Sequence, residues 1–210
     1  TSEIIVEGVD KLNPTDHEII GDRIAAGTFL AAILSTKGSG IVNGINPEHL
    51  PMELKKLGEM GAKIDSTETS INIEYRDNLQ SIELSTLPFP GIATDLQPIF
   101  GSALLLAEGT SILTENVYDQ RFQWIPEVQR MGANIQTGWQ HAMIKGVESL
   151  SGAPVHATDI RTGASLIIAA LQADGLSTIT GIDHINRGYE DIVTSLSSLG
   201  STIEYNNTNG

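Results

Sequence analysis

The sequence of 210 residues contains no cysteine, so it can form no disulfide, thiol nucleophile or cysteine-ligated zinc site of its own. Positive charge is also scarce, because 12 lysines and arginines stand against 26 aspartates and glutamates, a net charge of −14. Such a negative surface argues against binding to nucleic acid or to an anionic membrane. No apolar run reaches the roughly 18 residues of a membrane helix, and no signal-peptide pattern is present. We therefore expect a cytoplasmic protein.

Common cofactor and metal motifs are absent too. The five histidines show no spacing typical of a metal site. The sequence has no Walker loop, no Gly-x-Ser-x-Gly and no Gly-x-Gly-x-x-Gly dinucleotide fingerprint. We expect neither a bound metal ion nor a cofactor.

Three copies of one sequence unit organise the chain. The marker Met60-Gly61-Ala62 recurs as Met131-Gly132-Ala133 and as Leu199-Gly200-Ser201, with the glycines 71 and 68 residues apart. Upstream of each marker, an aspartate at the start of an apolar helix and a glycine-led apolar strand recur in the same order. The sequence therefore predicts repeats at residues 17–80, 81–150 and 151–210.

Each copy predicts a β-α-β-α-β-β unit. The expected opening strands are 17–21, 81–86 and 154–158, and the expected first helices are 22–35, 95–107 and 159–172. The second helix of each copy ends at the marker, where glycine forms a left-handed C-cap. The first helices are apolar nearly all round, which is typical of interior helices. We expect an α/β fold, an inside-out α/β barrel in which these three helices pack together inside.

The third copy stops before its final strand can form. Another segment must then complete that edge of the sheet. The N-terminal strand-like segment Glu3–Gly8 is one candidate, and a segment of a missing partner is the other.

Four of the six arginines lie at or just before helix starts: Arg23, Arg121, Arg161 and Arg187. The helix macrodipole disfavours a cation there by about 0.3–1 kcal/mol. The placement is reasonable if these helix starts face one site that binds phosphate or carboxylate groups. The alternative is that each arginine pairs with a nearby carboxylate, namely Asp22, Asp119, Asp159 or Asp183.

Three aspartates, Asp22, Asp95 and Asp159, occupy equivalent positions in the repeats. Aspartate is a good helix N-cap, and we favour that role for Asp22. Asp95 instead follows a stretch with two prolines and a glycine, residues 88–91. Such a rigid approach can hold a carboxylate at a cleft, where it could accept a proton from a substrate hydroxyl. The pattern leaves capping and catalysis both open for Asp95.

At these residues the sequence resembles the enolpyruvyl transferases. The matching stretches are residues 21–29, 89–97, 114–122, 157–161 and 184–190. The resemblance implies two similar domains, each an inside-out barrel of three units, with the active site between them. The chain resembles only the second half of such a protein. Residues 1–16 are then a crossover segment or strand from the end of a missing first domain, and residues 17–210 form the second domain.

The resemblance implies transfer of the enolpyruvyl group from phosphoenolpyruvate to the 3-hydroxyl of UDP-N-acetylglucosamine, in peptidoglycan precursor synthesis. The partner of this chain would be the missing first domain, which holds phosphoenolpyruvate, so the chain alone should be inactive. One rival is the shikimate-type enolpyruvyl transferase. The other is a non-catalytic binding module on the same fold.

The resemblance also implies individual roles. Asp95 binds the sugar hydroxyl and acts as the base, Asp159 is a second carboxylate at the reaction centre, and Val117 contacts the nucleotide sugar through its backbone. Arg187 reaches the enolpyruvyl group. The substrate anions are bound by Arg121, Arg161 and Arg187, with Arg23 as a further substrate-binding candidate.

Overall fold

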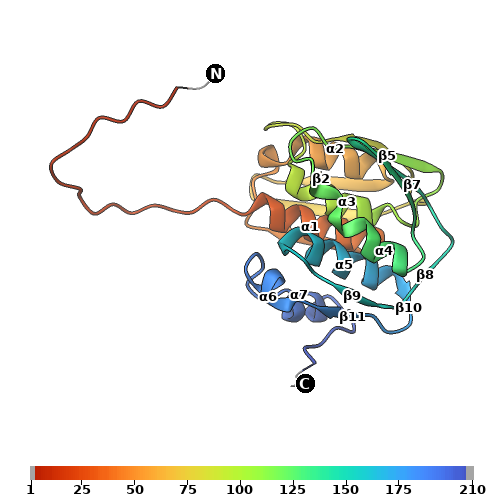
Figure 1. Ribbon diagram of the computed structural model, residues 1–210. Coiled ribbons are helices and arrows are strands. Elements are labelled where there is room, and N and C mark those ends of the chain that lie inside the picture. The colour runs from red at the N-terminus through yellow and green to blue at the C-terminus, as the bar shows by residue number, and fades with distance from the viewer. Residues whose placement is uncertain (1–2, 207–210) are drawn as a thin grey trace.

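The computed structural model describes residues 3–206 (Figure 1). Its helices are α1 (Arg23–Ser35), α2 (Pro51–Glu59), α3 (Gln97–Ala103), α4 (Ile125–Arg130), α5 (Ile160–Gln172), α6 (Ile182–Asn186) and α7 (Ile192–Ser198). Short 3-10 helices are η1 (Pro47–His49), η2 (Thr94–Leu96) and η3 (Arg121–Trp124). The fold is thus of the predicted α/β class.

The strands form four separate sheets. The first repeat contains β1 (Ser39–Asn43), β2 (Ala62–Ser66) and β3 (Ser70–Tyr75), in the order β1-β3-β2. The second contains β4 (Glu83–Ser85), β5 (Thr110–Thr114), β6 (Asn134–Gly138) and β7 (His141–Lys145), in the order β4-β5-β7-β6. Two parallel pairs complete the set: β8 (Leu150–Ser151) with β10 (Ala173–Asp174), and β9 (Pro154–His156) with β11 (Thr178–Thr180). The described residues therefore do not close into one barrel.

The first helices of the three repeats form the interior, as the sequence predicts. Helices α1, α3 and α5 contact one another, and Figure 1 shows the sheets and the other helices around them. All seven residues of α3 are buried, as are most residues of α1 and α5. Glycines allow close approach: a Cβ on Gly101 would lie 2.5 Å from the Trp124 ring, and one on Gly27 would lie 2.8 Å from Leu96.

The glycines of the repeated marker cap the second helices as predicted. Gly61, Gly132 and Gly200 have φ angles of 108°, 100° and 96°. Residues that carry a side chain rarely adopt backbone angles in this left-handed region, so glycine is favoured at all three positions.

The second repeat shows every element of the predicted unit, but the other two do not. Residues 17–21, predicted to be the opening strand of the first repeat, form no strand. They continue an exposed segment that begins at residue 3 and extends away from the body of the protein (Figure 1). The reason is that buried residues anchor β4 and β9, whereas residues 3–20 are all exposed and bury no side chain that would offset the entropy of ordering a short edge strand. In this structure Glu3–Gly8 therefore completes no sheet.

The described part of the third repeat, residues 151–206, contains neither of the two final strands. Residues 201–206 form no strand because a strand needs a neighbour to pair with, and the described part of the chain supplies none there. The last four residues of the predicted third repeat, 207–210, lie outside the described residues.

No helix within residues 3–206 combines the length and the apolar character that crossing a membrane requires.

Candidate active site

The side chain of Asp95 lies between two arginines from different parts of the chain. Arg121 Nη2 donates a hydrogen bond to Asp95 Oδ1 at 3.0 Å, and Arg161 Nη2 lies 2.9 Å from Asp95 Oδ2. The two arginine side chains are mostly buried, while Asp95 is 35% exposed. The start of α5 and the start of η3 thus meet at η2, which carries Asp95.

Asp95 is not a helix cap. It is the middle residue of η2, whose N-cap position is Ala93, and it makes no capping hydrogen bond. The segment before η2 is compact, since a Cβ on Gly91 would lie only 2.5 Å from Leu87 Cβ. The capping explanation that the sequence left open for Asp95 is therefore wrong, whereas Asp22 does cap α1 through the amides of Ile24 and Ala25.

Arg121 is fixed by three contacts. Its Nε donates to Thr94 Oγ1 at 3.1 Å, its Nη2 pairs with Asp95, and its guanidinium lies 4.7 Å from the centre of the Tyr118 ring. Among residues 3–206, no ion pair joins the four helix-start arginines to Asp22, Asp119, Asp159 or Asp183. The alternative that each arginine pairs with a nearby carboxylate is therefore wrong. Arg121 and Arg161 form ion pairs with Asp95 instead.

Asp159 caps α5 and also faces Arg121. Its carboxylate accepts hydrogen bonds from the amides of Arg161 at 2.8 Å and Thr162 at 3.1 Å, and from the Thr162 hydroxyl. Burial raises the pKa of Asp159, but the Thr162 and Arg161 hydrogen bonds and the charge of Arg121 outweigh it and lower the pKa below its ordinary value. Asp159 also lines a hollow of about 260 Å³ with Tyr118, Gln120, Arg121 and Gln123. An anionic ligand there would meet Arg121.

Arg23 lies apart from these ion pairs. Its guanidinium lies 5.4 Å from the centre of the Phe89 ring, and its Nη1 is buried without a hydrogen-bond partner within residues 3–206. It lines a second hollow of about 500 Å³ with Asp22, His49 and Phe89. The buried carboxylate of Glu53, on α2, is close enough for the charge of Arg23 to affect its pKa.

The structure does not bring Arg187 into the Asp95 cluster. Arg187 is exposed at the end of α6 and forms no ion pair with another residue of the described range. Its neighbour Gly188 packs on Ile160 at the start of α5, and Tyr189 shares a hydrogen bond of 2.8 Å with Thr28 of α1. The segment around Arg187 is therefore attached to the start of α5 and to the middle of α1.

Val117 is half exposed in the loop after β5, and its amide is already bound by a carboxylate. The amide donates to Glu115 Oε1 at 2.9 Å, and the Tyr118 amide donates to the same oxygen at 3.0 Å. Thr86 donates its hydroxyl to this oxygen at 2.6 Å. Sequence reasoning missed Glu115 and Thr86, although a comparison of the repeats shows glycine where the second repeat has Glu115.

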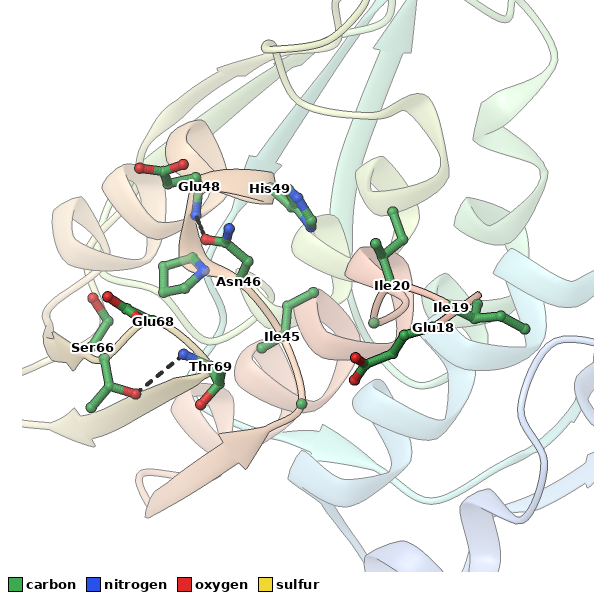
Figure 2. A pocket seen from close by; sticks show the side chains of 14 residues that line it. Glu18, Ile19, Ile20, Ile45, Asn46, Glu48, His49, Ser66, Glu68 and Thr69 are labelled. Atoms are coloured by element: carbon green, nitrogen blue, oxygen red, sulfur yellow. Dashed lines mark hydrogen bonds between the residues drawn. The ribbon is translucent and has the colours of Figure 1, made fainter. Parts of the chain in front are cut away.

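A further, larger hollow lies elsewhere, in the first repeat. It measures about 1070 Å³ and is open to solvent. Figure 2 shows Ile19 and Ile20 on one side and Asn46, Glu68 and Thr69 on the other. Its position is where β1 ends and where an opening strand was expected.

Across residues 3–206, no group of three or more histidine, aspartate or glutamate side chains is placed to hold a metal ion.

Comparisons with known proteins define the class. A family model described as EPSP synthase (3-phosphoshikimate 1-carboxyvinyltransferase) matches residues 1–196, so the chain belongs to this family of enolpyruvyl transferases. The solved structure of the enolpyruvyl transferase NikO from Streptomyces tendae is similar with a TM-score of 0.79 and 26% identity, over 89% of this chain and 44% of that one. An EPSP synthase from Acinetobacter baumannii shares the fold, with a TM-score of 0.74 and 21% identity, over 89% of this chain and 47% of that one.

Curated relatives are more similar in sequence. The UDP-N-acetylglucosamine 1-carboxyvinyltransferase of Thermotoga maritima is 46% identical over 205 residues, which cover 98% of this chain and 49% of that protein. The enzyme of the same name from Corynebacterium jeikeium is 43% identical over 204 residues, 97% of this chain and 49% of that protein. The chain spans about half the length of these relatives.

Proposed function

We propose that this chain forms one half of an enzyme that transfers the enolpyruvyl group of phosphoenolpyruvate to the 3-hydroxyl of UDP-N-acetylglucosamine, for peptidoglycan precursors. Membership of the enolpyruvyl transferase family supports the reaction class. Relatives that are 43–46% identical and carry the name UDP-N-acetylglucosamine 1-carboxyvinyltransferase support this acceptor.

One observation carries the proposal: Asp95 lies between Arg121 and Arg161, at 3.0 and 2.9 Å. Arg121 and Arg161 bring two mostly buried guanidinium groups to one carboxylate, in a chain of net charge −14. Guanidinium groups bind phosphate and carboxylate groups, of which UDP-N-acetylglucosamine carries phosphates and phosphoenolpyruvate carries both kinds.

The proposed reaction is an addition followed by an elimination. The sugar oxygen bonds to C2 of phosphoenolpyruvate while its proton passes to Asp95 and C3 takes up a proton from an acid that the other half would supply. The bond from C2 to the phosphate oxygen then breaks, C3 returns its proton to that acid, and the phosphate leaves with the proton that Asp95 held. Arg121 and Arg161 stabilise the anionic groups along this path.

The remaining site residues complete the proposal. Asp159 is a second carboxylate at the reaction centre, which its position beside Arg121 supports. Val117 contacts the nucleotide sugar through its backbone, Arg23 contributes to substrate binding, and Arg187 reaches the enolpyruvyl group once the other domain is in place. Domain closure would have to bring Arg187 closer, because it lies outside the cluster here.

The missing half makes a direct test possible. We expect no phosphate release from phosphoenolpyruvate and UDP-N-acetylglucosamine with this chain alone, and release when the first half of a relative is added. Turnover by the chain alone would contradict the two-half proposal. Activity with shikimate 3-phosphate instead would identify the shikimate-type enzyme, and substrate binding without turnover in the mixture would indicate a binding module.

The role of Asp95 has its own test. In the assembled enzyme, Asp95→Ala should lower kcat at least about a hundredfold, because a general base is lost. Asp65→Ala is a matched control, since it removes a surface carboxylate that pairs with Lys63 at 3.0 Å. A near-normal rate for Asp95→Ala would show that the carboxylate only holds the two arginines together.

A further inference from the structure

Glu115 is a fully buried carboxylate directly after β5. Its Oε1 accepts three hydrogen bonds, from the Thr86 hydroxyl at 2.6 Å and the amides of Val117 and Tyr118 at 2.9 and 3.0 Å. Its Oε2 is buried and has no hydrogen-bond partner within residues 3–206. Burying a carboxylate oxygen in this way is unfavourable, so folding stability alone does not explain the residue.

The other two repeats have glycine at this position. Gly44 follows β1 with a φ of 77°, and Gly181 follows β11 with a φ of 80°. A Cβ on Gly181 would lie 2.3 Å from the Ala157 carbonyl oxygen, so a side chain cannot fit there without movement. The first and third repeats therefore form the turn after the central strand without a carboxylate, and only the second repeat has one there.

Glu115 joins the two loops that carry the candidate active site. The first loop begins after Thr86 at the end of β4 and leads to Asp95. The second begins at Asn116, whose amide donates to Thr86 Oγ1 at 2.9 Å and whose Nδ2 donates to the Thr86 carbonyl at 3.1 Å. Thr86 and Glu115 thus tie the start of one loop to the start of the other.

The second loop continues from Glu115 to Arg121 through direct contacts. Glu115 binds the amide of Tyr118, and the Tyr118 carbonyl accepts a hydrogen bond from the Arg121 amide at 3.0 Å. The Tyr118 ring lies against the Arg121 guanidinium, which in turn contacts Asp95. A shift of the loop at Glu115 would therefore move the guanidinium relative to Asp95.

We propose that Glu115, together with Thr86, is a positioning residue that orients the Arg121 guanidinium against Asp95. It touches neither Asp95 nor a substrate and acts through the loop of Val117 and Tyr118. The catalytic consequence rests on the proposed function, but the structural coupling does not.

Hydrogen exchange by NMR on this chain tests the coupling without substrate. Glu115→Ala should make the Val117 and Tyr118 amides and the Arg121 Nε–H exchange at least about tenfold faster, because the carboxylate that holds the loop is gone. Glu115→Gln keeps an accepting oxygen and should restore most of the protection. If Glu115→Ala does not fold, Thr86→Val removes the hydroxyl and Thr86→Ser restores it, with the same expectations.

Ser111→Ala is the matched control. Ser111 Oγ is also buried and joins the same two strands at their other end, where it accepts from the Ile82 amide at 3.1 Å. This variant should leave the Arg121 Nε–H exchange unchanged. Faster exchange of the Val117 and Tyr118 amides with an unchanged Arg121 Nε–H in Glu115→Ala or Thr86→Val would overturn the proposal, since Glu115 would then hold only its own turn.

Kinetics of the assembled enzyme give the second readout. Thr86→Val should lower kcat at least about tenfold with a smaller change in KM, and Thr86→Ser should restore it, because Arg121 acts on the reacting groups. Exchange coupling in a protein with no enolpyruvyl transfer would contradict the proposed function and support the positioning role. Exchange coupling with unchanged kcat in an active enzyme would overturn the positioning role in catalysis.

Discussion

The first and second repeats are built on the same pattern but differ at their outer edge. In the second repeat, β4 covers the outer edge of β5. In the first repeat no described residue pairs with the outer edge of β1, Ile41 on β1 is 61% exposed, and the hollow of Figure 2 lies beside the end of this strand. The difference shows that an opening strand forms only where buried residues before it anchor it.

The two repeats also differ at two equivalent positions. After the central strand, the second repeat has Glu115 and the first has Gly44. Seven residues before the repeated marker, the second repeat has Trp124 and the first has Glu53, both fully buried. The third repeat has Gly181 and Ile192 at these positions. One fold pattern therefore accepts an aromatic ring, an aliphatic chain or a carboxylate in the same place.

The largest effect should come from the aromatic anchor of the second repeat. Trp124 packs against Gly101 of α3, and its Nε1 donates to Gln97 at 3.1 Å. Trp124→Ala should lower the free energy of unfolding by about 3–5 kcal/mol, because it leaves a large cavity. Denaturant unfolding would measure this, with Trp139→Ala as a control because Trp139 is fully exposed. Equal effects of the two variants would contradict the packing described here.

Substitution of Gly44 in the first repeat and of Gly181 in the third by alanine should lower the free energy of unfolding by different amounts. Gly181→Ala should cost about 2–4 kcal/mol, because its Cβ would clash with the Ala157 carbonyl in a left-handed backbone. Gly44→Ala should cost only about 1–2 kcal/mol, since its Cβ would meet open space and only the backbone strain remains. Thermal or denaturant unfolding of the two variants would measure these losses of stability. Equal losses would mean that the clash at Gly181 is relieved at little cost.

Glu53 should be less favourable than an apolar residue at its position. Burial raises the pKa of Glu53, although nearby backbone amides and the charge of Arg23 oppose it. A raised pKa means that stability falls as the pH rises from the ordinary value of 4.5 through the folded value. Glu53→Met should therefore stabilise the protein at pH 7 by about 1 kcal/mol, with a smaller gain at pH 4.

Unfolding at both pH values would check this prediction for Glu53. Glu48→Met on exposed η1 is the control and should change little at either pH. A loss of stability for Glu53→Met at pH 7 would show that the interaction with Arg23 outweighs the burial of the charge.

The smallest effect concerns Asp159 in the third repeat, where the pKa shift has the opposite sign. Its lowered pKa contributes stability above the ordinary value of 3.8, and this contribution is lost as the pH falls through the folded value. Asp159→Asn keeps an N-cap on α5 but removes the stabilisation by the carboxylate charge, which is about a few tenths of a kcal/mol after solvent screening. The unmodified chain should be more stable than Asp159→Asn at pH 6, and this difference in the free energy of unfolding should disappear by pH 2. A gap that persists at pH 2 would indicate a role for Asp159 other than its charge.

Part of the candidate site could be read from the sequence. The repeat pattern and the arginines at helix starts pointed to Asp95, Arg121 and Arg161, which the structure brings together. The partners of the arginines could not be read in the same way, because Asp95 is 26 residues from Arg121 and 66 from Arg161 in the chain. Glu115 was missed since a lone glutamate after a strand resembles a solvated loop residue until its burial is known.

The amino-acid pattern by itself determined the α/β class, the three interior helices and the glycine caps, because hydrophobic periodicity and glycine conformation act over a few residues. Only the tertiary structure decided which opening strands form, which carboxylate the arginines share and which acidic side chains are buried. These outcomes depend on contacts between segments far apart in the chain and on the competition between packing and conformational entropy.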